Sequence, residues 1–280
     1  AVGVLAFQLK DFTVAEKSME KLLGMKYRDP DAVRYILGQI AEERSDWPGA
    51  VKWYDQIDDG EHALAARLRT ANAMAKEGKL DAARQYLHKV AAENPGQEVQ
   101  VTVAEAQLLR DAKRYQDAFD LLGASLKDDP EQPELLYDYA LTAEKVDRFD
   151  VLEASLRKLI KVRPDHAHAY NALGYSLAER NERLPEAKKL ILKALSLSPE
   201  DSFIIDSLGW VQYRQGDLKG ALQTLRRAYE GRPDPEIGAH LGEVLWKLGN
   251  HAEANRIWDE SLKSAPDNEN LRETVQRFRK

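Results

Sequence analysis

A small residue recurs through this chain at steps of 33 to 35 residues. Alanine holds the position in seven copies and leucine in one: Ala15, Ala50, Ala83, Ala118, Leu152, Ala187, Ala221 and Ala254. A fixed period of this length is typical of one supersecondary unit copied in tandem. Because such a unit is too small to bury its own apolar face, the copies must stack on one another, and a single domain is predicted.

Two further series divide each copy into two helices. A second small residue precedes the first by twelve or thirteen positions: Gly3, Gly38, Ala71, Ala106, Ala140, Gly174, Gly209 and Gly242. Small side chains at both positions let two helix backbones approach closely. A proline follows by twelve positions in six copies: Pro95, Pro130, Pro164, Pro199, Pro233 and Pro266. Proline cannot continue a helix, so it marks the end of the second helix.

Turn and cap residues complete the unit. One position between the two helices holds residues that tolerate a left-handed backbone: Gly78, Asn181, Gly216 and Gly249. Candidate N-caps of the next first helix follow the prolines: Asp165, Asp201 or Ser202, and Asp267. Leu152 departs from the alanine pattern and predicts a looser helix pair in its own copy.

The predicted fold is all-α, a solenoid of about eight helix–turn–helix copies followed by a closing helix at 269–280. The copies are expected at 1–30, 31–63, 64–98, 99–132, 133–166, 167–201, 202–234 and 235–268. Gly3 already holds the eighth place of its copy, so the first helix is cut short. We therefore expect the chain to be a fragment of a longer protein.

The clearest copy spans Ser202–Pro233, with Leu-Gly, Gly-Asp, two alanines and the final proline at regular places. This pattern resembles the tetratricopeptide repeat (TPR) family, and the resemblance covers essentially the whole chain. It weakens at the N-terminal end, where Tyr27 and His62 stand in place of the proline. The resemblance implies a right-handed superhelix whose first helices line a concave, protein-binding groove.

Composition excludes several classes of function. The 41 Lys and Arg residues are interspersed with 47 Asp and Glu residues, for a net charge of −6, so the basic face of a nucleic-acid-binding protein is absent. The chain has no cysteine, which excludes disulfides, thiolate metal sites and a cysteine nucleophile. Hydrolase, zinc-protease and nucleotide-binding motifs are also absent, so we expect no catalytic residue and no cofactor.

One histidine lies within reach of two carboxylates. Glu236, His240 and Glu243 are spaced by four and three residues and can share one helix face. Such a set can form a weak metal site. A solvated helix surface is the commoner reason for this pattern, so no metal site is predicted.

The predicted partner-binding surface is the inner face of copies five to eight. With the small residue counted as place eight, places 2, 5, 9, 12 and 13 of each first helix are expected to line the groove. In these copies they include Tyr137, Asn171, Tyr175, Phe203, Asp206, Trp210, Tyr213, Arg214, Glu236, Glu243, Trp246 and Lys247. Aromatic side chains are enriched in binding hot spots. Tyr213 and Trp246 have an alternative role, packing between adjacent repeats, whereas Trp210 is expected in the groove.

The last copies carry a narrower resemblance. The stretches Asp206–Gly216 and Asp234–Trp246 resemble the C-terminal part of the outer-membrane TPR lipoproteins of Gram-negative bacteria, in particular the Pseudomonas adaptors that partner a periplasmic carboxyl-terminal processing protease. This resemblance implies a noncatalytic adaptor that presents cell-wall hydrolases to the protease on the periplasmic side of the outer membrane. Membrane attachment is then expected only through a lipid anchor in an upstream part. The alternative function is the regulatory TPR region of an enzyme whose catalytic domain is absent from this chain.

Overall fold

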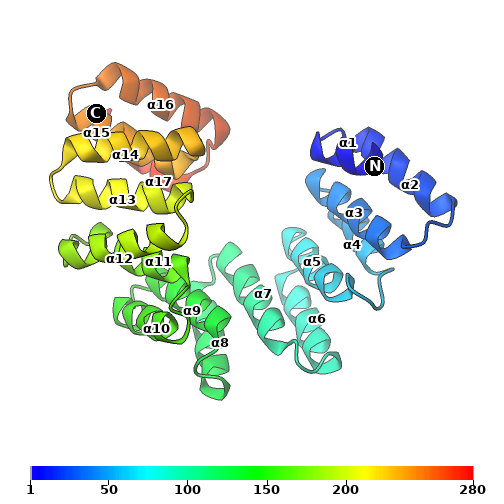
Figure 1. Ribbon diagram of the computed structural model, residues 1–280. Helices are drawn as coiled ribbons and strands as arrows, with labels where there is room; N and C mark the ends of the chain where they lie inside the picture. Colours follow the sequence, from blue (N-terminus) through cyan, green and yellow to red (C-terminus); the bar gives the residue numbers. More distant parts are fainter. Residues whose placement is uncertain (1, 280) are drawn as a thin grey trace. The chain divides into compact units, whose positions relative to one another are not determined.

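The computed structural model describes residues 2–279, and all regular structure in that range is helical (Figure 1). Eight helix pairs and a last helix follow one another along the chain. They are α1 (Val2–Gln8), α2 (Phe12–Gly24), α3 (Pro30–Glu43), α4 (Trp47–Tyr54), α5 (Ala63–Lys76), α6 (Leu80–Glu93), α7 (Glu98–Asp111), α8 (Tyr115–Asp128), α9 (Pro133–Lys145), α10 (Phe149–Val162), α11 (Ala167–Glu179), α12 (Leu184–Leu197), α13 (Ser202–Arg214), α14 (Leu218–Gly231), α15 (Pro235–Lys247), α16 (His251–Ser264) and α17 (Glu269–Phe278). The all-α prediction is confirmed.

The helices form two compact units. Unit 1 comprises Ala1–Asp129 and unit 2 comprises Pro130–Lys280. Within each unit, the second helix of every pair packs against the first helix of the next pair. The single continuous domain expected from the repeat stays a prediction, and each unit is described by itself below.

The recurring small residues lie at the crossing of the two helices of a pair. Every member of the alanine series is buried, and Leu152, the one exception to alanine, is only 1% exposed. A Cβ atom added to Gly209 would lie 2.6 Å from Leu225 Cγ, and one added to Gly174 would lie 2.8 Å from the Ala187 carbonyl oxygen. These glycines therefore keep each first helix in close contact with its second helix, as the spacing predicts.

The expectation of a looser pair at Leu152 is wrong. Helices α9 and α10 contact each other at least as extensively as α5 and α6, which carry alanine at that position. The leucine side chain is fully buried and adds apolar area to the pair instead of separating its helices.

The predicted helix ends are confirmed. Each proline of the series stands two residues after the last residue of a second helix, as Pro233 does after α14. The turn residues Gly78, Gly216 and Gly249 have φ angles of 84°, 86° and 83°, and Asn181 has a φ of 57°. The left-handed backbone at these four positions ends the first helix of the pair.

Only one of the predicted N-caps has that role. The Asp201 carboxylate accepts hydrogen bonds from the backbone N–H groups of the first turn of α13. The N-cap of α11 is His166, whose Nδ1 accepts from the Ala169 N–H, and the N-cap of α17 is Asn268. Asp165 and Asp267 each lie one residue too early, and Asp165 pairs instead with Arg163 at 3.1 Å.

Replacing Asp201 with alanine is expected to destabilise unit 2 by about 1 kcal/mol, because two N–H groups at the start of α13 lose their acceptor. The matched change at Asp165 is expected to leave the stability unchanged within error, because this residue is exposed and caps no helix. Urea unfolding followed by circular dichroism measures both variants. Equal losses would contradict the cap assignment.

The helices of residues 2–279 all fall short of the length and apolar character that crossing a bilayer requires.

Candidate functional site

The candidate site is the first-helix face of unit 2, which we define as the side chains that α11, α13, α15 and α17 present to one another and to solvent on the predicted inner side. Helix α13 packs against α11 on one side and α15 on the other. Helix α17 packs more extensively on α15 than on α16, so it covers part of the same face. These four helices supply every side chain of the polar network described next.

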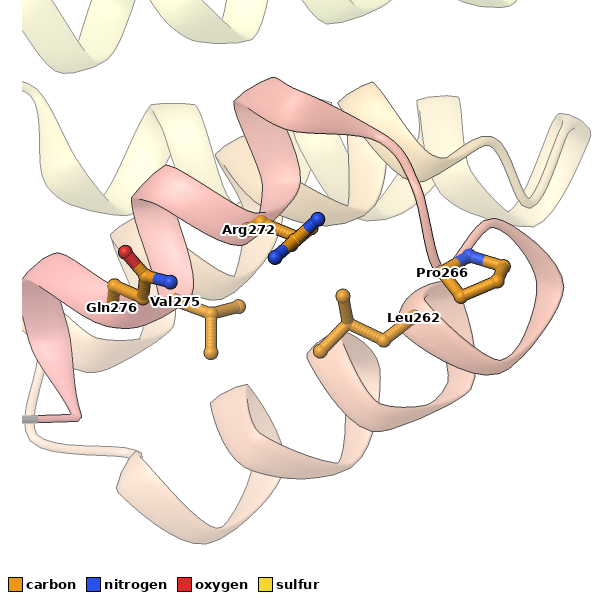
Figure 2. Close-up of a pocket in the computed structure, with 5 residues that line it drawn as sticks. All are labelled: Leu262, Pro266, Arg272, Val275 and Gln276. Atoms are coloured by element: carbon orange, nitrogen blue, oxygen red, sulfur yellow. The ribbon is translucent and has the colours of Figure 1, made fainter.

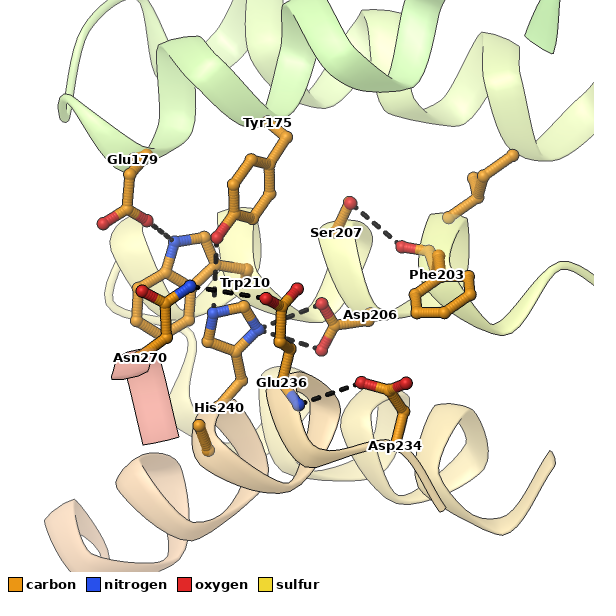
Figure 3. A network of polar contacts seen from close by, with 12 residues as sticks. Tyr175, Glu179, Phe203, Asp206, Ser207, Trp210, Asp234, Glu236, His240 and Asn270 are labelled. Carbon is orange, nitrogen blue, oxygen red and sulfur yellow. Dashed lines mark hydrogen bonds and ion pairs between the residues drawn. The ribbon is translucent and has the colours of Figure 1, made fainter. Parts of the chain in front are cut away.

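His240 of α15 is the centre of that network (Figure 3). Its Nδ1 lies 3.0 Å from both carboxylate oxygens of Asp206 on α13. Its Nε2 lies 3.4 Å from the hydroxyl oxygen of Tyr175 on α11. Its ring stacks on the indole of Trp210, with 4.1 Å between centroids and 20° between planes. One side chain therefore contacts residues of the two preceding first helices.

Trp210 extends the network to the end of α11. Its Nε1–H donates to Glu179 Oε2 at 2.7 Å (Figure 3). The Arg214 guanidinium donates to the Glu179 carbonyl oxygen at 2.9 Å and lies 5.8 Å from the Trp210 ring centroid. The carboxylate and the backbone carbonyl of Glu179 thus both bond the C-terminal end of α11 to α13.

Helix α17 completes the face on the other side. The Tyr213 hydroxyl donates to Glu243 Oε1 at 2.8 Å, and Arg277 of α17 pairs with the second oxygen of the same carboxylate. Asn270 of α17 donates to Glu236 at 3.4 Å. The carboxylates of α15 that face inward are therefore bonded to groups from α13 and α17.

The surroundings favour the protonated, cationic form of His240 and the protonated, neutral form of Tyr175. Burial alone would lower the pKa of His240, but the Asp206 carboxylate, with Glu179 and Glu243 farther away, raises the pKa of His240 above its ordinary value. Burial, together with Glu179, Asp206 and other nearby carboxylates, raises the pKa of Tyr175 well above its usual range. The Tyr175 hydroxyl thus stays protonated at neutral pH.

The structure brings about half of the predicted site residues into this network. They are Tyr175, Asp206, Trp210, Tyr213, Arg214, Glu236 and Glu243. The others lie outside it. Tyr137 packs on His166 with 5.3 Å between ring centroids, Phe203 is 39% exposed beside Arg232, and Lys247 lies 5.3 Å from the Phe278 ring centroid. The side-chain oxygen Oδ1 of Asn171 is buried without a hydrogen-bond partner.

Two expectations about this face require correction. Trp210 was expected in the groove but is 4% exposed, because α15 places His240 over its ring. A solvated surface was expected for Glu236, His240 and Glu243, yet Glu243 is 6% exposed and His240 is ion-paired with Asp206. Of the three, only Glu236 is exposed.

The structure favours the alternative role of packing between repeats for Tyr213, whereas Trp246 packs within its own copy and against the closing helix. Tyr213 bonds to the following first helix. Trp246 packs against Trp258 and Phe278, with centroid distances of 5.6 and 6.3 Å. Whether any residue of the face contacts a partner stays a prediction.

Sequence reasoning missed Glu179, Asn270 and Arg277, and it assigned His240 to a solvated surface instead of the site. Glu179 stands at place 13 of its copy, so the same count finds it. His240 stands at place 6, outside the inner places, but the pairing has a precedent in unit 1. There Arg69, also at place 6, donates from its Nε–H to the Tyr35 hydroxyl at 2.9 Å. Both pairs, Arg69 with Tyr35 and His240 with Asp206, join residues 34 positions apart. A search for polar residues at places 5 and 6 of successive copies would have found both pairs.

Residues 2–279 contain no group of three or more His, Asp or Glu side chains placed to hold a metal ion. A small apolar pocket of about 270 Å³ opens between α16 and α17 (Figure 2). It is lined by Leu262, Pro266, Arg272, Val275 and Gln276, none of which belongs to the predicted site.

Family models and known proteins agree on the type of repeat. Tetratricopeptide repeat models match residues 3–63, 65–96 and 145–202. A TPR repeat-containing protein of Pseudomonas aeruginosa is 42% identical over 213 residues, which cover 76% of this chain and 36% of that protein. Cellulose synthase operon protein C of Pseudomonas fluorescens is 24% identical, with 92% of this chain and 22% of that protein covered. The chain thus spans about a third or less of the length of these relatives.

Solved structures share the fold. A TPR protein of Parabacteroides merdae aligns with a TM-score of 0.67 at 13% identity and covers 94% of this chain and all of that chain. A thermophilic TPR protein of Thermus thermophilus aligns with a TM-score of 0.58 at 24% identity and covers 64% of this chain and 98% of that chain. At these identities the likeness shows the fold alone.

Proposed function

Because the chain belongs to the tetratricopeptide repeat family, we propose that it is a scaffold that binds other proteins through the first-helix face of unit 2. The observation that carries this proposal is the polar network that joins α11, α13, α15 and α17, in which Asp206, Trp210 and Glu243 are buried. A face whose helices are already held in place loses less conformational entropy when a partner binds.

The exposed rim of the face supplies the contacts that a partner can reach. Phe203 at the start of α13, Glu236 at the start of α15 and Lys247 at its end are all exposed. They combine an aromatic ring with charges of both signs, so recognition is expected to be only modestly sensitive to salt, unlike that of a site built on charge alone.

The finer proposal is a noncatalytic adaptor at the periplasmic side of the outer membrane, attached through a lipid anchor upstream. In this role it presents cell-wall hydrolases to a carboxyl-terminal processing protease. Support comes from the sequence resemblance at Asp206–Gly216 and Asp234–Trp246, and from the similarity to a Pseudomonas aeruginosa TPR repeat-containing protein.

A triple variant, Phe203→Ala, Glu236→Ala and Lys247→Ala, is expected to weaken binding of a purified cell-wall hydrolase or of the purified protease by about 2 kcal/mol, roughly 30-fold in Kd. The three side chains are exposed, so the helical circular dichroism of the protein should not change. Surface plasmon resonance with each purified Pseudomonas protein measures the effect.

The matched control is the pair Lys219→Ala and Gln223→Ala, which alters exposed residues of the second helix α14. Binding should survive these changes. If the control loses binding while the triple variant keeps it, the partner binds the second-helix side. Hydrolysis of casein or cell-wall material by the repurified chain alone would contradict the noncatalytic role.

A further inference from the structure

His240 is a largely buried, titratable side chain at which three helices meet. Its side chain is 15% exposed, and that of Asp206, its partner, is 8% exposed. It contacts Tyr175 of α11 as well as Asp206 and Trp210 of α13 (Figure 3). Because a protonated imidazole donates from both ring nitrogens, the cationic form can bond to Asp206 and to the Tyr175 hydroxyl oxygen at once.

The groups around His240 are mostly acidic. Tyr175 and Glu179 come from α11 and Asp206 from α13, while Glu236 and Glu243 lie on α15 itself. From α17, Arg277 pairs with Glu243, and the uncharged Asn270 bonds to Glu236. The cation on His240 therefore lies among carboxylates, of which Asp206 is the one in direct contact.

We propose that His240 is a pH-sensitive positioning residue of the first-helix face: its protonated form holds α11, α13 and α15 together and keeps Trp210 and Tyr175 in place, and this order is lost when His240 releases its proton. The inference goes beyond the proposed function, because it concerns the face itself and does not depend on which partner binds.

Loss of the proton changes the balance of interactions at this point. The neutral ring with its proton on Nδ1 still donates to Asp206, and its Nε2 accepts from the Tyr175 hydroxyl, so both hydrogen bonds survive and the change is the loss of the positive charge. The attraction between the imidazolium and the Asp206 carboxylate, which is strong because both groups are shielded from water, disappears. The Asp206 carboxylate then lacks its cationic partner, whereas Glu243 keeps its ion pair with Arg277.

The direction of the pH dependence follows from the raised pKa of His240. A group whose pKa is higher in the folded protein than in the unfolded chain stabilises the folded state fully below the ordinary histidine value of about 6.5. This contribution is lost as the pH rises through the pKa of the folded protein. The face is therefore expected to be most ordered in mildly acidic solution.

Two measurements on the whole chain test the proposal. Proton–carbon NMR of the histidine rings, from about pH 5 to about pH 9, reports the proton affinity of His240 in the wild type and in Asp206→Asn. Hydrogen exchange of the α13 and α15 backbone amides, corrected for the intrinsic pH dependence of exchange, reports the order of the face. Asp206→Asn removes the charge and keeps the shape of the side chain.

We expect the proton affinity of His240 to fall at least about tenfold in Asp206→Asn. An opposite charge in contact with a titratable group typically changes its pKa by about one unit or more, and this variant removes that charge. In the wild type, protection of α13 and α15 should fall at least about tenfold above the pKa of His240. In His240→Phe, which keeps a ring against Trp210, protection should no longer change with pH. The control His88→Gln, at an exposed histidine of α6 in unit 1, should behave as the wild type.

Two results would overturn the proposal: an unchanged proton affinity in Asp206→Asn, or wild-type protection that does not vary across the titration of His240. If Asp206→Asn does not fold, the comparison of the wild type with His240→Phe decides alone. Equal pH profiles for these two proteins would show that the ring acts only by packing.

Discussion

Replacing Gly242 with leucine is expected to destabilise unit 2 by at least about 3 kcal/mol, the upper part of the range for overpacked cores. A Cβ atom at this position would collide with the indole ring of Trp258. That ring is fully buried and stacks between Trp246 and Phe278, with centroid distances of 5.6 and 6.0 Å, so it has no free space into which to move. Urea unfolding followed by tryptophan fluorescence measures the loss.

The matched control is Gly24→Leu at the end of α2. A Cβ atom there meets no other atom within 4 Å, so the larger side chain projects into open space. Both changes replace a helical glycine by leucine, and the gain in helix propensity is at most about 1 kcal/mol at either position. A loss of several kcal/mol at Gly242 alone therefore reports the collision. Equal stabilities would contradict the close helix crossing at the small residues.

Replacing Trp210 with alanine is expected to cost about 3–5 kcal/mol, the usual loss for a large aromatic residue in a core. The side chain is 4% exposed and lies between His240 and Tyr213, with ring centroid distances of 4.1 and 5.0 Å. The change also leaves Glu179 without the indole N–H that it accepts. A binding assay on this variant would mix loss of folding with loss of contact, so its stability is the property to measure.

Phe203→Ala on the same helix provides the comparison. Phe203 is 39% exposed and belongs to the rim of the face, so its truncation is expected to cost less than about 1 kcal/mol. Thermal unfolding by circular dichroism separates the two variants by several degrees. A loss for Trp210→Ala as small as that for Phe203→Ala would mean that Trp210 is a surface residue, as its place in the repeat alone suggests.

Backbone chemistry explains why helix ends were predictable here. Proline lacks an N–H group and disfavours helical geometry in the residue before it, so Pro233 limits α14 whatever packs around it. Gly216 adopts a φ of 86° for an equally local reason. The N-caps were less predictable, because aspartate, histidine and asparagine side chains can each accept a hydrogen bond from a backbone N–H group. Where two of them are adjacent, the exact first residue of the helix decides which one is the cap.

The candidate site shows the limit of counting along the repeat. The count places Trp210 and Asp206 on the first-helix side, but it does not say whether the next helix covers them. Burial depends on what α15 carries opposite them, and α15 carries His240. The role of Glu243 likewise depends on Arg277 of the closing helix, which lies 34 residues later, one period beyond the last complete copy.

The sequence by itself determined the unit, its period and its helix crossings, because each depends on residues whose size or backbone preference acts over a few positions: small residues at the crossings, prolines after the second helices and left-handed residues in the turns. Only the tertiary structure decided which side chains of the first-helix face are buried and which are exposed to solvent. The Asp206–His240 pair and the Trp210–Glu179 bond join residues 34 and 31 positions apart. Their formation depends on how neighbouring helices pack, because a hydrogen bond or ion pair requires two particular side chains to meet within about 3 Å.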